Sequence, residues 1–424
     1  MNPSVVVVFE DGAEGALWPL AATRPVWDLR TGGHTLADKL RANFPDAQFA
    51  FVGRGDVLAA TAEDQGPLPG LPDLRIQGDV LWVNGRALAD QRWIDEILGQ
   101  EGGRRYTCGN RVLAFAHAAG RTAQVLREPA LWTDASARKI GDFIDATLDA
   151  PFIDAIWDLL RYNHQELLVE GELVVRAAHG AELAPRENPA LMPGAHLVSP
   201  GAIALHPTAR VSPGAVLDAS NGPIVVERDV LIEPHSYVAG PSWIGAGTHV
   251  LGGKLGGGVS LGPVCRVAGE IEESIFQGFA NKRHHGFVGH SIVGAWANLG
   301  ALTTTSDLKN NYGSVRVSIG GRVHDTGESK IGSFLGDHVK TAIGTLLTTG
   351  AVVGPATNLV GGATASPKEL PAFAWWDGAT VAAYEIEKFI ATARIVCSRR
   401  SRTFGEEQEA LYRLIAAQAA GGRP

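Results

Sequence analysis

The residues with the greatest chemical potential lie in two stretches past the middle of the chain. NKRHHGFVGH at 281–290 holds three histidines, and TTTSDLKNNY at 303–312 holds an aspartate and a lysine. Histidine is the side chain best suited to take a proton at neutral pH. Lysines near it can neutralise phosphate groups. These stretches therefore predict proton-transfer chemistry beside an anionic substrate.

Two of these histidines also suggest a metal site as an alternative. His285 and His290 have the spacing His-x4-His, and His249 lies upstream of them. The set resembles the zinc histidines of γ-class carbonic anhydrases, which share the coil predicted below. The three residues fall in different phases of that coil's repeat, which does not suit one coordination sphere. We therefore assign no metal ligand and keep the zinc enzyme as an alternative.

The element that must position these residues is a coil built from a six-residue repeat over 200–363. Apolar residues recur at every sixth position, as at Ile232, Val238 and Ile244, and small residues follow many of them. A helix has a period of about 3.6 and an antiparallel strand one of about 2, so neither explains the pattern. A coil with three flat faces and about 18 residues per turn does, with small residues at its tight corners. Breaks in phase predict loops near 217–226, 250–255 and 305–330.

The segments on either side of the coil have a different pattern. Residues 1–165 predict an α/β domain, and residues 166–199 connect it to the coil. Residues 364–424 predict an aromatic anchor followed by helices. Strands are expected at 5–9, 48–52, 81–83 and 112–115. Helices are expected at 36–42, 92–98, 150–171, 381–396 and 406–417.

The motifs of the second half resemble a known family. Acetyl-, acyl- and succinyltransferases built on hexapeptide repeats fold as a left-handed parallel β-helix, and the stretches at 281–291, 296–301 and 303–312 are similar to the GlmU family in particular. Its members are bifunctional glucosamine-1-phosphate acetyltransferases and N-acetylglucosamine-1-phosphate uridylyltransferases. The chain looks most like the shorter, divergent GlmU-like sugar nucleotidyltransferases, through GDHVK at 336–340 and the Arg399-Arg400 pair as well. The resemblance implies a Rossmann-like nucleotidyltransferase domain, the β-helix, C-terminal helices and a homotrimer.

The resemblance also implies roles for individual residues. His284 would be the base that deprotonates the sugar amine, and Asn298 would position the amine or the reacting carbonyl, with acetyl-CoA as co-substrate. Phe287 and Asp307 stand where many members have tyrosine and asparagine, which is expected to change the sugar that fits. The implied substrate contacts are Lys282, Phe287, Asp307, Lys309 and Asn310. The implied coenzyme A contacts are Lys330 and Lys340.

The N-terminal half departs further from the family. Ordinary sugar nucleotidyltransferases wrap the nucleotide phosphates with a Gly-x-Gly-Thr-Arg loop, whereas here Arg24 and Arg30 would hold them. The family places a Mg²⁺-binding aspartate at the end of a central strand, where this chain has Asn84, a weaker ligand for a hard cation. Asp79 and Asp11 are the other acidic candidates. Three outcomes stay open for this half: an active uridylyltransferase that uses Mg²⁺, an enzyme of altered specificity, and a domain that only binds nucleotide. If Asn84 replaces the metal aspartate, uridylyl transfer is expected to be slow or absent.

Composition limits the remaining classes. A net charge of −8 argues against a nucleic-acid or membrane-surface binder, and no apolar run reaches the length of about 18 to 20 residues that a membrane helix needs. Three distant cysteines predict a cytoplasmic protein. We expect an amino-sugar-1-phosphate acetyltransferase. The other classes kept open are the zinc enzyme above and a non-catalytic trimeric scaffold or nucleotide-sugar sensor. Arg394, Arg399, Arg400 and Arg402 are expected on a solvated face, with a phosphate contact as the alternative.

Overall fold

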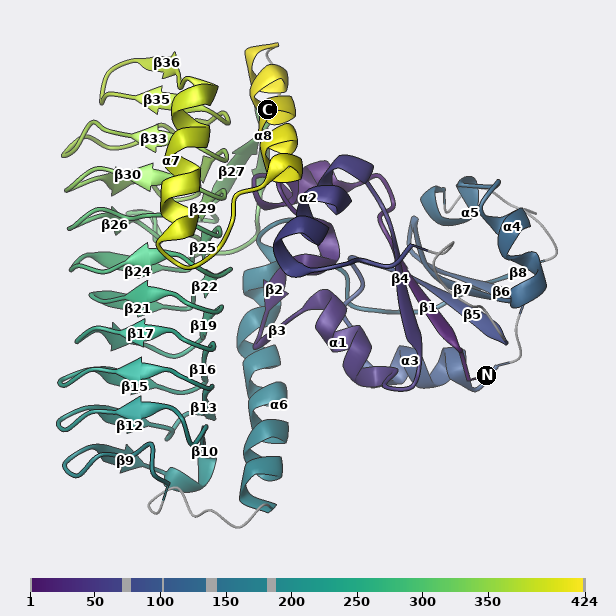
Figure 1. Cartoon of the computed structure of the whole chain (residues 1–424), viewed down its shortest axis with the longest axis horizontal. Helices are drawn as coiled ribbons and strands as arrows, with labels where there is room; N and C mark the ends of the chain where they lie inside the picture. Colours follow the sequence, from purple (N-terminus) through teal and green to yellow (C-terminus); the bar gives the residue numbers. More distant parts are fainter. Residues whose placement is uncertain (1, 71–77, 101–102, 135–142, 181–187, 422–424) are drawn as a thin grey trace.

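The computed structural model describes residues 2–70, 78–100, 103–134, 143–180 and 188–421. It consists of an N-terminal α/β domain, a long helix α6 (Asp158–Gly180), a parallel β-solenoid and two C-terminal helices. Figure 1 shows α6 running along the stacked turns of the solenoid, between them and the N-terminal domain. The predicted fold class is thereby confirmed.

The N-terminal domain is built on a six-stranded sheet of order β4-β1-β5-β7-β6-β8. Strand β1 pairs in parallel with β4 and β5, and β7 runs antiparallel to β5. All five residues of β1 are buried, because elements cover both faces of the sheet, which explains the unbroken apolar run. The strands are β1 (Val5–Phe9), β4 (Gln48–Val52), β5 (Asp79–Asn84), β6 (Arg104–Cys108), β7 (Arg111–Ala118) and β8 (Ile144–Thr147).

Short helices and a small hairpin surround this sheet. Thr35 caps α1, its side chain accepting a hydrogen bond from the Asp38 amide at 3.1 Å. The α-helices are α1 (Leu36–Asn43), α2 (Gly55–Gln65), α3 (Gln91–Leu98), α4 (Thr122–Val125) and α5 (Ala130–Thr133). The hairpin strands are β2 (Arg30–Thr31) and β3 (His34–Thr35). The 3-10 helices are Glu14–Leu17, Leu20–Ala22, Val26–Asp28 and Ala119–Arg121.

Helix α6 joins the two main parts of the molecule. Asn163, which is 1% exposed, accepts from the Gly32 amide and donates to the Gly258 carbonyl. The Lys39 ammonium forms ion pairs with Glu166 and Glu170 of α6. The prediction of a helix over 150–171 is wrong in its bounds. The helix begins at Asp158, whose carboxylate accepts from the amides of Asp154 and Ala155, and it continues to Gly180.

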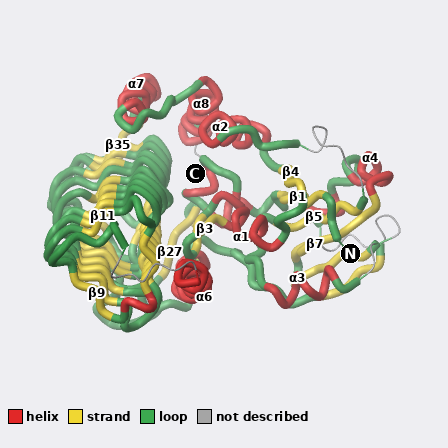
Figure 2. The backbone as a smooth tube through the Cα atoms, turned by 60° about the horizontal axis from the view of Figure 1, so that its bottom comes forward, coloured by secondary structure: helices red, strands yellow, loops and turns green. Residues whose placement is uncertain are grey.

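The solenoid has three faces, and its turns stack in parallel (Figure 2). The first face is a nine-stranded sheet: β10 (Ile203–Leu205), β13 (Ile224–Val226), β16 (Ser242–Ile244), β19 (Val259–Leu261), β22 (Ile275–Phe276), β25 (Ile292–Val293), β29 (Ser333–Leu335), β32 (Ala351–Val353) and β34 (Glu369–Leu370). The second face holds β11 (Arg210–Val211), β14 (Leu231–Ile232), β17 (His249–Val250), β20 (Arg266–Val267), β23 (Asn281–Lys282), β30 (Lys340–Thr341), β33 (Asn358–Leu359) and β35 (Ala374–Trp376). The third face holds β9 (His196–Val198), β12 (Val216–Asp218), β15 (Tyr237–Ala239), β18 (Lys254–Leu255), β21 (Glu270–Glu272) and β24 (Phe287–Gly289), continued by β26 (Thr304–Thr305) and β31 (Leu346–Leu347).

The six-residue repeat corresponds to the inward positions of these strands. Ile232, Val238, Ile244 and Val250 are all fully buried in one apolar cluster that fills the coil. Ile292 pairs with Phe334, so the break predicted near 305–330 is an insertion within one turn. It carries the hairpin β27 (Arg316–Ile319) and β28 (Arg322–Asp325). The coil extends beyond its predicted limits of 200 and 363, since β9 and β35 belong to its faces.

Two helices close the C-terminus, α7 (Ile386–Ser398) and α8 (Glu406–Ala420). The prediction of one helix over 381–396 is wrong at its start. Residues Val381–Ala383 form strand β36, which pairs antiparallel with β35, and the helix begins only at Ile386. Among the described residues, no helix is both long and apolar enough to cross a lipid bilayer.

Candidate active sites

His284 and Asn298 line one pocket of about 580 Å³, called here the coil pocket. It lies where the second face of the solenoid meets α7 and the segment after it. Its lining residues are Arg266, Phe279, Asn281, Arg283, His284, Trp296, Asn298, Leu299, Gly300, Ala301, Lys340, Ile343, Val396, Arg399 and Arg400.

The parallel register of the second face explains why these residues meet. Arg266 pairs with Asn281, Asn281 with Asn298, and Asn298 with Lys340. These four residues occupy the outward position of successive turns, so residues distant in sequence form one row. All four line the pocket, and His284 lies on the corner that follows Asn281 and Lys282.

The His284 side chain is exposed, whereas Lys282 beside it is fully buried. Lys282 takes the inward position of its strand, where other turns carry apolar residues. Its ammonium donates to the His284 carbonyl, and burial lowers the pKa of Lys282 to about 8. Lys282 therefore holds the backbone that carries His284 and does not line the pocket.

The coil pocket is rich in positive charge. Five cationic side chains line it, and no aspartate or glutamate is among its lining residues. Arg400 donates to the Asn281 side-chain oxygen at 3.0 Å, while its Nε is buried without a partner. Burial lowers the pKa of Lys340 to about 8, and burial together with neighbouring arginines lowers the pKa of Arg266. Such an arrangement favours an anionic ligand that brings its own negative charges.

The sequence prediction missed part of this pocket. Arg266 and Arg283 were not expected there, and Arg399 and Arg400 were expected on a solvated face. The structure puts both members of that pair in the pocket. Arg394, in contrast, forms an ion pair with Glu409 of α8. Arg266 could be placed in the pocket only from the register of the coil, in which it pairs with Asn281 of the next turn.

The other predicted substrate and coenzyme contacts lie outside the coil pocket in this chain. Asp307 accepts from His290 Nδ1 at 2.8 Å. Burial raises the pKa of that carboxyl, but His290 and Lys330 outweigh it, so the pKa is lowered. Lys309 donates to the Ser314 carbonyl at 2.5 Å. Asn310 is exposed, and the Phe287 ring packs against Gly289. The backbone of Lys330 pairs with that of Leu308 in an isolated antiparallel β-bridge.

One group of side chains has the composition of a metal site. Glu272, His290 and Asp307 offer ligand atoms that lie within 4.8 Å of one another. No other group of three His, Cys, Asp or Glu side chains comes this close in the described part of the chain. His249, His285 and His290 are therefore not assembled as a zinc triad within this chain.

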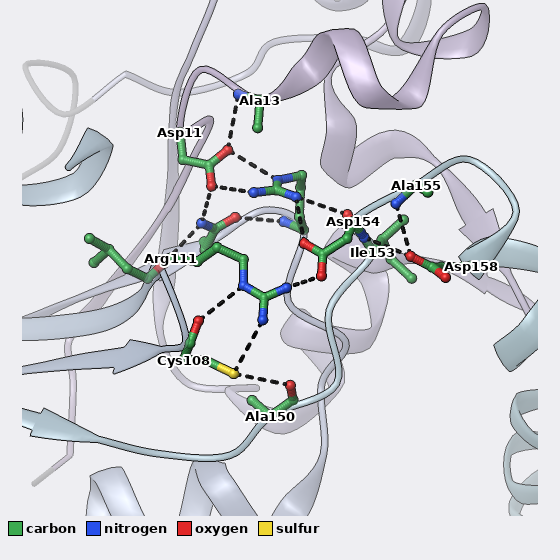
Figure 3. A network of polar contacts seen from close by, with 12 residues as sticks. Asp11, Ala13, Cys108, Arg111, Ala150, Ile153, Asp154, Ala155 and Asp158 are labelled. Atoms are coloured by element: carbon green, nitrogen blue, oxygen red, sulfur yellow. Dashed lines mark hydrogen bonds and ion pairs between the residues drawn. The ribbon is translucent and has the colours of Figure 1, made fainter. Parts of the chain in front are cut away.

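In the N-terminal domain, Asp11 belongs to a polar network just after β1 (Figure 3). Asn84, the last residue of β5, is part of the same network. Its amide, fully buried, donates to Asp11 and to the Val112 carbonyl, both at 2.9 Å. Arg86 donates to both Asp11 oxygens, at 3.1 and 2.6 Å. Burial alone would raise the pKa of Asp11, but Arg86 and Asn84 lower it.

This network does not fit the Mg²⁺ site of ordinary sugar nucleotidyltransferases. Both oxygens of Asp11 already accept from Arg86 or Asn84, and a guanidinium stands where a divalent cation would need oxygen ligands. Asp79 begins β5, at the end of the strand away from Asn84. We derive no metal-dependent step from these residues.

Arg24 and Arg30 lie apart from Asn84, in a second pocket of about 350 Å³ called here the interdomain pocket. Arg24 forms ion pairs with Asp28 at 3.2 Å and with Asp337 of the solenoid at 2.6 Å. The three predicted nucleotide contacts are therefore divided between two places. The lining residues are Thr23, Arg24, Trp27, Asp28, Arg30, Thr35, Ala37, Asp38, Arg41, Phe51, Ala60, Thr61, Asp64, Gln65, Leu68, Pro263, Gln277, Gly278, Phe279, Ala295, Trp296, Asp337, His338, Arg402, Gln408, Leu411 and Tyr412.

Comparison with known proteins bears on both halves. Residues 6–178 match the family model described as sugar nucleotidyl transferase. A bifunctional sugar-1-phosphate nucleotidylyltransferase/acetyltransferase of Sulfurisphaera tokodaii is 30% identical over 94 residues, which are 22% of this chain and 23% of that protein. The match thus spans about a quarter of the curated relative. The sugar nucleotidyl transferase domain, this relative and the left-handed β-helix together fit a GlmU-like protein.

Proposed function

We propose that the chain is a transferase of nucleotide-sugar biosynthesis that moves an acetyl group from acetyl-CoA to an amino-sugar-1-phosphate in the coil pocket. The observation that carries the proposal is the composition of this pocket. An exposed histidine and an asparagine share it with five cations and no carboxylate. Coenzyme A and a sugar-1-phosphate are both polyanions, and the similar protein of Sulfurisphaera tokodaii is named as an acetyltransferase.

The chemistry follows from the side chains that line the pocket. His284 takes a proton from the sugar amine as its nitrogen attacks the thioester carbon. The Asn298 amide donates a hydrogen bond to the oxygen on which negative charge develops. When the carbon–sulfur bond breaks, the protonated His284 returns the proton to the coenzyme A sulfur. The arginines and Lys340 hold the phosphates and so orient both substrates.

The N-terminal domain is proposed to bind a sugar nucleotide while transferring nucleotide slowly or not at all. The support is the buried contact of Asp11 with Arg86 and Asn84, which occupies the place of the expected Mg²⁺ ligands. Incubation with UTP, Mg²⁺ and N-acetylglucosamine-1-phosphate should release little pyrophosphate. Rapid release would show that the network opens or that another residue holds the metal.

The acetyltransferase proposal is tested by His284→Ala. Loss of a general base lowers the rate by about 10²- to 10⁴-fold. The melting temperature should change little, because the side chain is exposed and forms no hydrogen bond within the described residues. The assay follows coenzyme A release from acetyl-CoA with glucosamine-1-phosphate and related amino-sugar phosphates. His285→Ala is the matched control, since His285 is the exposed neighbour and does not line the pocket.

Two results would contradict this proposal. One is activity retained in His284→Ala while His285→Ala or His290→Ala loses both activity and bound zinc, which would favour the carbonic-anhydrase-like alternative. The other is the absence of acetyl transfer by the wild-type protein with every amino-sugar phosphate tried. That outcome would favour a scaffold or a nucleotide-sugar sensor.

A further inference from the structure

The interdomain pocket has walls from three parts of the chain. Arg24 and Arg30 come from the N-terminal domain, Gln277 and His338 from the solenoid, and Arg402 from the segment between α7 and α8. The acetyl transfer proposed above makes no use of this pocket, in which Arg24 and Arg30 are the two residues that the resemblance implies as nucleotide-phosphate contacts.

Buried polar atoms without partners gather around the interdomain pocket. They are Arg24 Nε, Arg30 Nε, Gln277 Nε2 and His338 Nδ1, half of all such side-chain atoms in the described residues. Gln277 is 6% and His338 2% exposed, so bulk water does not reach them freely. Buried polar groups in proteins are nearly always hydrogen-bonded to protein, ligand or ordered water, so four unpartnered atoms around one cavity favour a bound partner there. Both arginine nitrogens and the glutamine amide are donors, so that partner must supply acceptor oxygens.

The lining of the pocket is balanced in charge, with four arginines and four aspartates, and what favours an anionic partner is the arginines that no aspartate pairs with. Arg30 and Arg402 form no ion pair with a carboxylate in the residues that the structure describes. Asp337 is already engaged by Arg24, Thr23 and the Ala295 amide. Asp28 likewise accepts from Arg24 and Gln65. Asp38 forms an ion pair with Arg41. Burial raises the pKa of the remaining carboxylate, Asp64, although the charges of Arg402 and Arg24 oppose that shift.

Aromatic rings supply part of the surface of the pocket. Trp27 stacks on Phe51 with centroids 5.3 Å apart, and Phe279 stacks on Trp296 at 4.4 Å. Arg402 lies over the Phe279 ring at 5.4 Å. Phe279 and Trp296 also line the coil pocket, so the two pockets share this pair as a wall. A ligand with an anionic end and a larger polar body fits such a combination of surfaces.

We propose that the interdomain pocket is a second binding site, for a small phosphate monoester whose oxygens accept hydrogen bonds from Arg24, Arg30 and Gln277. The site is separate from the coil pocket and does not depend on acetyl transfer. Inorganic phosphate carries the same acceptor oxygens, so both the ion and an ester bind, and the ester body contacts the aromatic wall.

The test is calorimetric titration of the full-length protein with inorganic phosphate, glucose-1-phosphate and uncharged glucose. The wild type should bind glucose-1-phosphate at least as tightly as phosphate, and glucose undetectably. Arg30→Gln should weaken phosphate binding at least tenfold. Gln277→Glu keeps the size of the side chain and the oxygen that accepts from the Arg30 amide, but it replaces the NH₂ donor with a carboxylate oxygen. It should therefore also weaken phosphate binding at least tenfold. Arg228→Gln, at an exposed arginine that lines neither pocket, is the matched control and should leave this binding within about twofold. Arg283→Gln, in the coil pocket, reports phosphate binding at that other site.

Each result decides the proposal. It is overturned if the wild type binds neither phosphate compound at millimolar concentration, or if both pocket variants bind like the wild type. It is also overturned if only Arg283→Gln loses binding, because the phosphate then occupies the coil pocket. Should Arg30→Gln fail to fold, Gln277→Glu decides alone. Acetyl-CoA titration of each variant checks the coil pocket separately, so failure of this site and failure of the proposed function are distinguishable.

Discussion

Among the cations of the coil pocket, Lys340 is the one whose charge responds to pH near neutrality. Burial lowers its pKa to about 8, whereas an arginine stays charged throughout. The attraction of Lys340 for an anion is therefore present below that pH and lost as the pH rises through it. A bound anion stabilises the charged form, which moves the loss to somewhat higher pH.

This gives a prediction for ligand affinity. Between pH 7 and 9.5 the affinity of the wild type for coenzyme A should fall by about tenfold, the value of one charge-assisted hydrogen bond of ~1.5 kcal/mol. Lys340→Arg should show a smaller decrease over the same range. Calorimetric titration at half-unit pH steps measures both curves. Parallel curves for the two proteins would assign the pH dependence to a different group.

At the residue scale, the sequence could predict the residues that stand in a recognisable motif. His284, Asn298 and Lys340 were identified in this way and share one pocket. Lys282 was predicted to contact substrate, although it follows Phe276 by one repeat and so occupies an inward position. Its place in the repeat was a usable signal of burial. The cations contributed by Arg266 and Arg283 could not be predicted, because they depend on the register between turns.

At the scale of elements, α6 is the connection between the N-terminal domain and the solenoid. Its bounds could not be predicted well, because residues 150–157 are partly apolar but not helical. The Asp158 carboxylate accepts from the amides of Asp154 and Ala155 and so holds the turn that precedes the helix. The C-terminal segment illustrates a similar competition. Residues 381–383 have a helical pattern but pair with the edge of β35 instead, since the solenoid offers an open strand there.

The contribution of α6 is tested by Asn163→Ala. The substitution removes hydrogen bonds to Gly32 on one side and Gly258 on the other, and it leaves those buried groups without partners. The free energy of unfolding should fall by about 1–3 kcal/mol per unsatisfied group. Denaturant unfolding followed by circular dichroism measures the change.

The neighbouring residue provides the control. His164 forms an ion pair with Glu273 at 3.0 Å, but its side chain is 45% exposed. An exposed ion pair contributes only about 0–1 kcal/mol, so His164→Ala should change stability little. Equal losses of stability in the two variants would mean that helix propensity, and not the buried hydrogen bonds of Asn163 to Gly32 and Gly258, determines the effect.

At the scale of the whole molecule, the repeat predicted the solenoid because each turn obeys the same local rule. The contact between the halves follows no such rule. Arg24 and Asp337 lie far apart in sequence, yet their side chains meet at 2.6 Å where the N-terminal domain docks on the solenoid. No periodicity encodes that pairing. The interdomain pocket and its unpartnered donors therefore could not be predicted from the sequence.

The largest-scale prediction concerns assembly. The resemblance to GlmU-like proteins implied a homotrimer, and the surface beside the coil pocket gives a physical reason to expect partner chains. Ile343 is 72% exposed and lines the rim of that pocket, and Leu302 on the preceding turn is 57% exposed. Burial of a large apolar side chain stabilises an interface by about 1.5–3 kcal/mol. Such residues on a solenoid corner are expected to pack against a neighbouring copy.

Light scattering coupled to size exclusion should therefore give three times the chain mass of 44.7 kDa at micromolar concentration. Ile343→Glu should shift the population toward monomer, because a charge desolvated at an apolar contact costs more than the contact contributes. Val323→Glu is the matched control. Val323 is 65% exposed but lies on the β27–β28 hairpin, away from the coil pocket. A wild-type protein that stays monomeric would contradict the trimer, and dissociation by the hairpin variant alone would place the interface on the insertion instead.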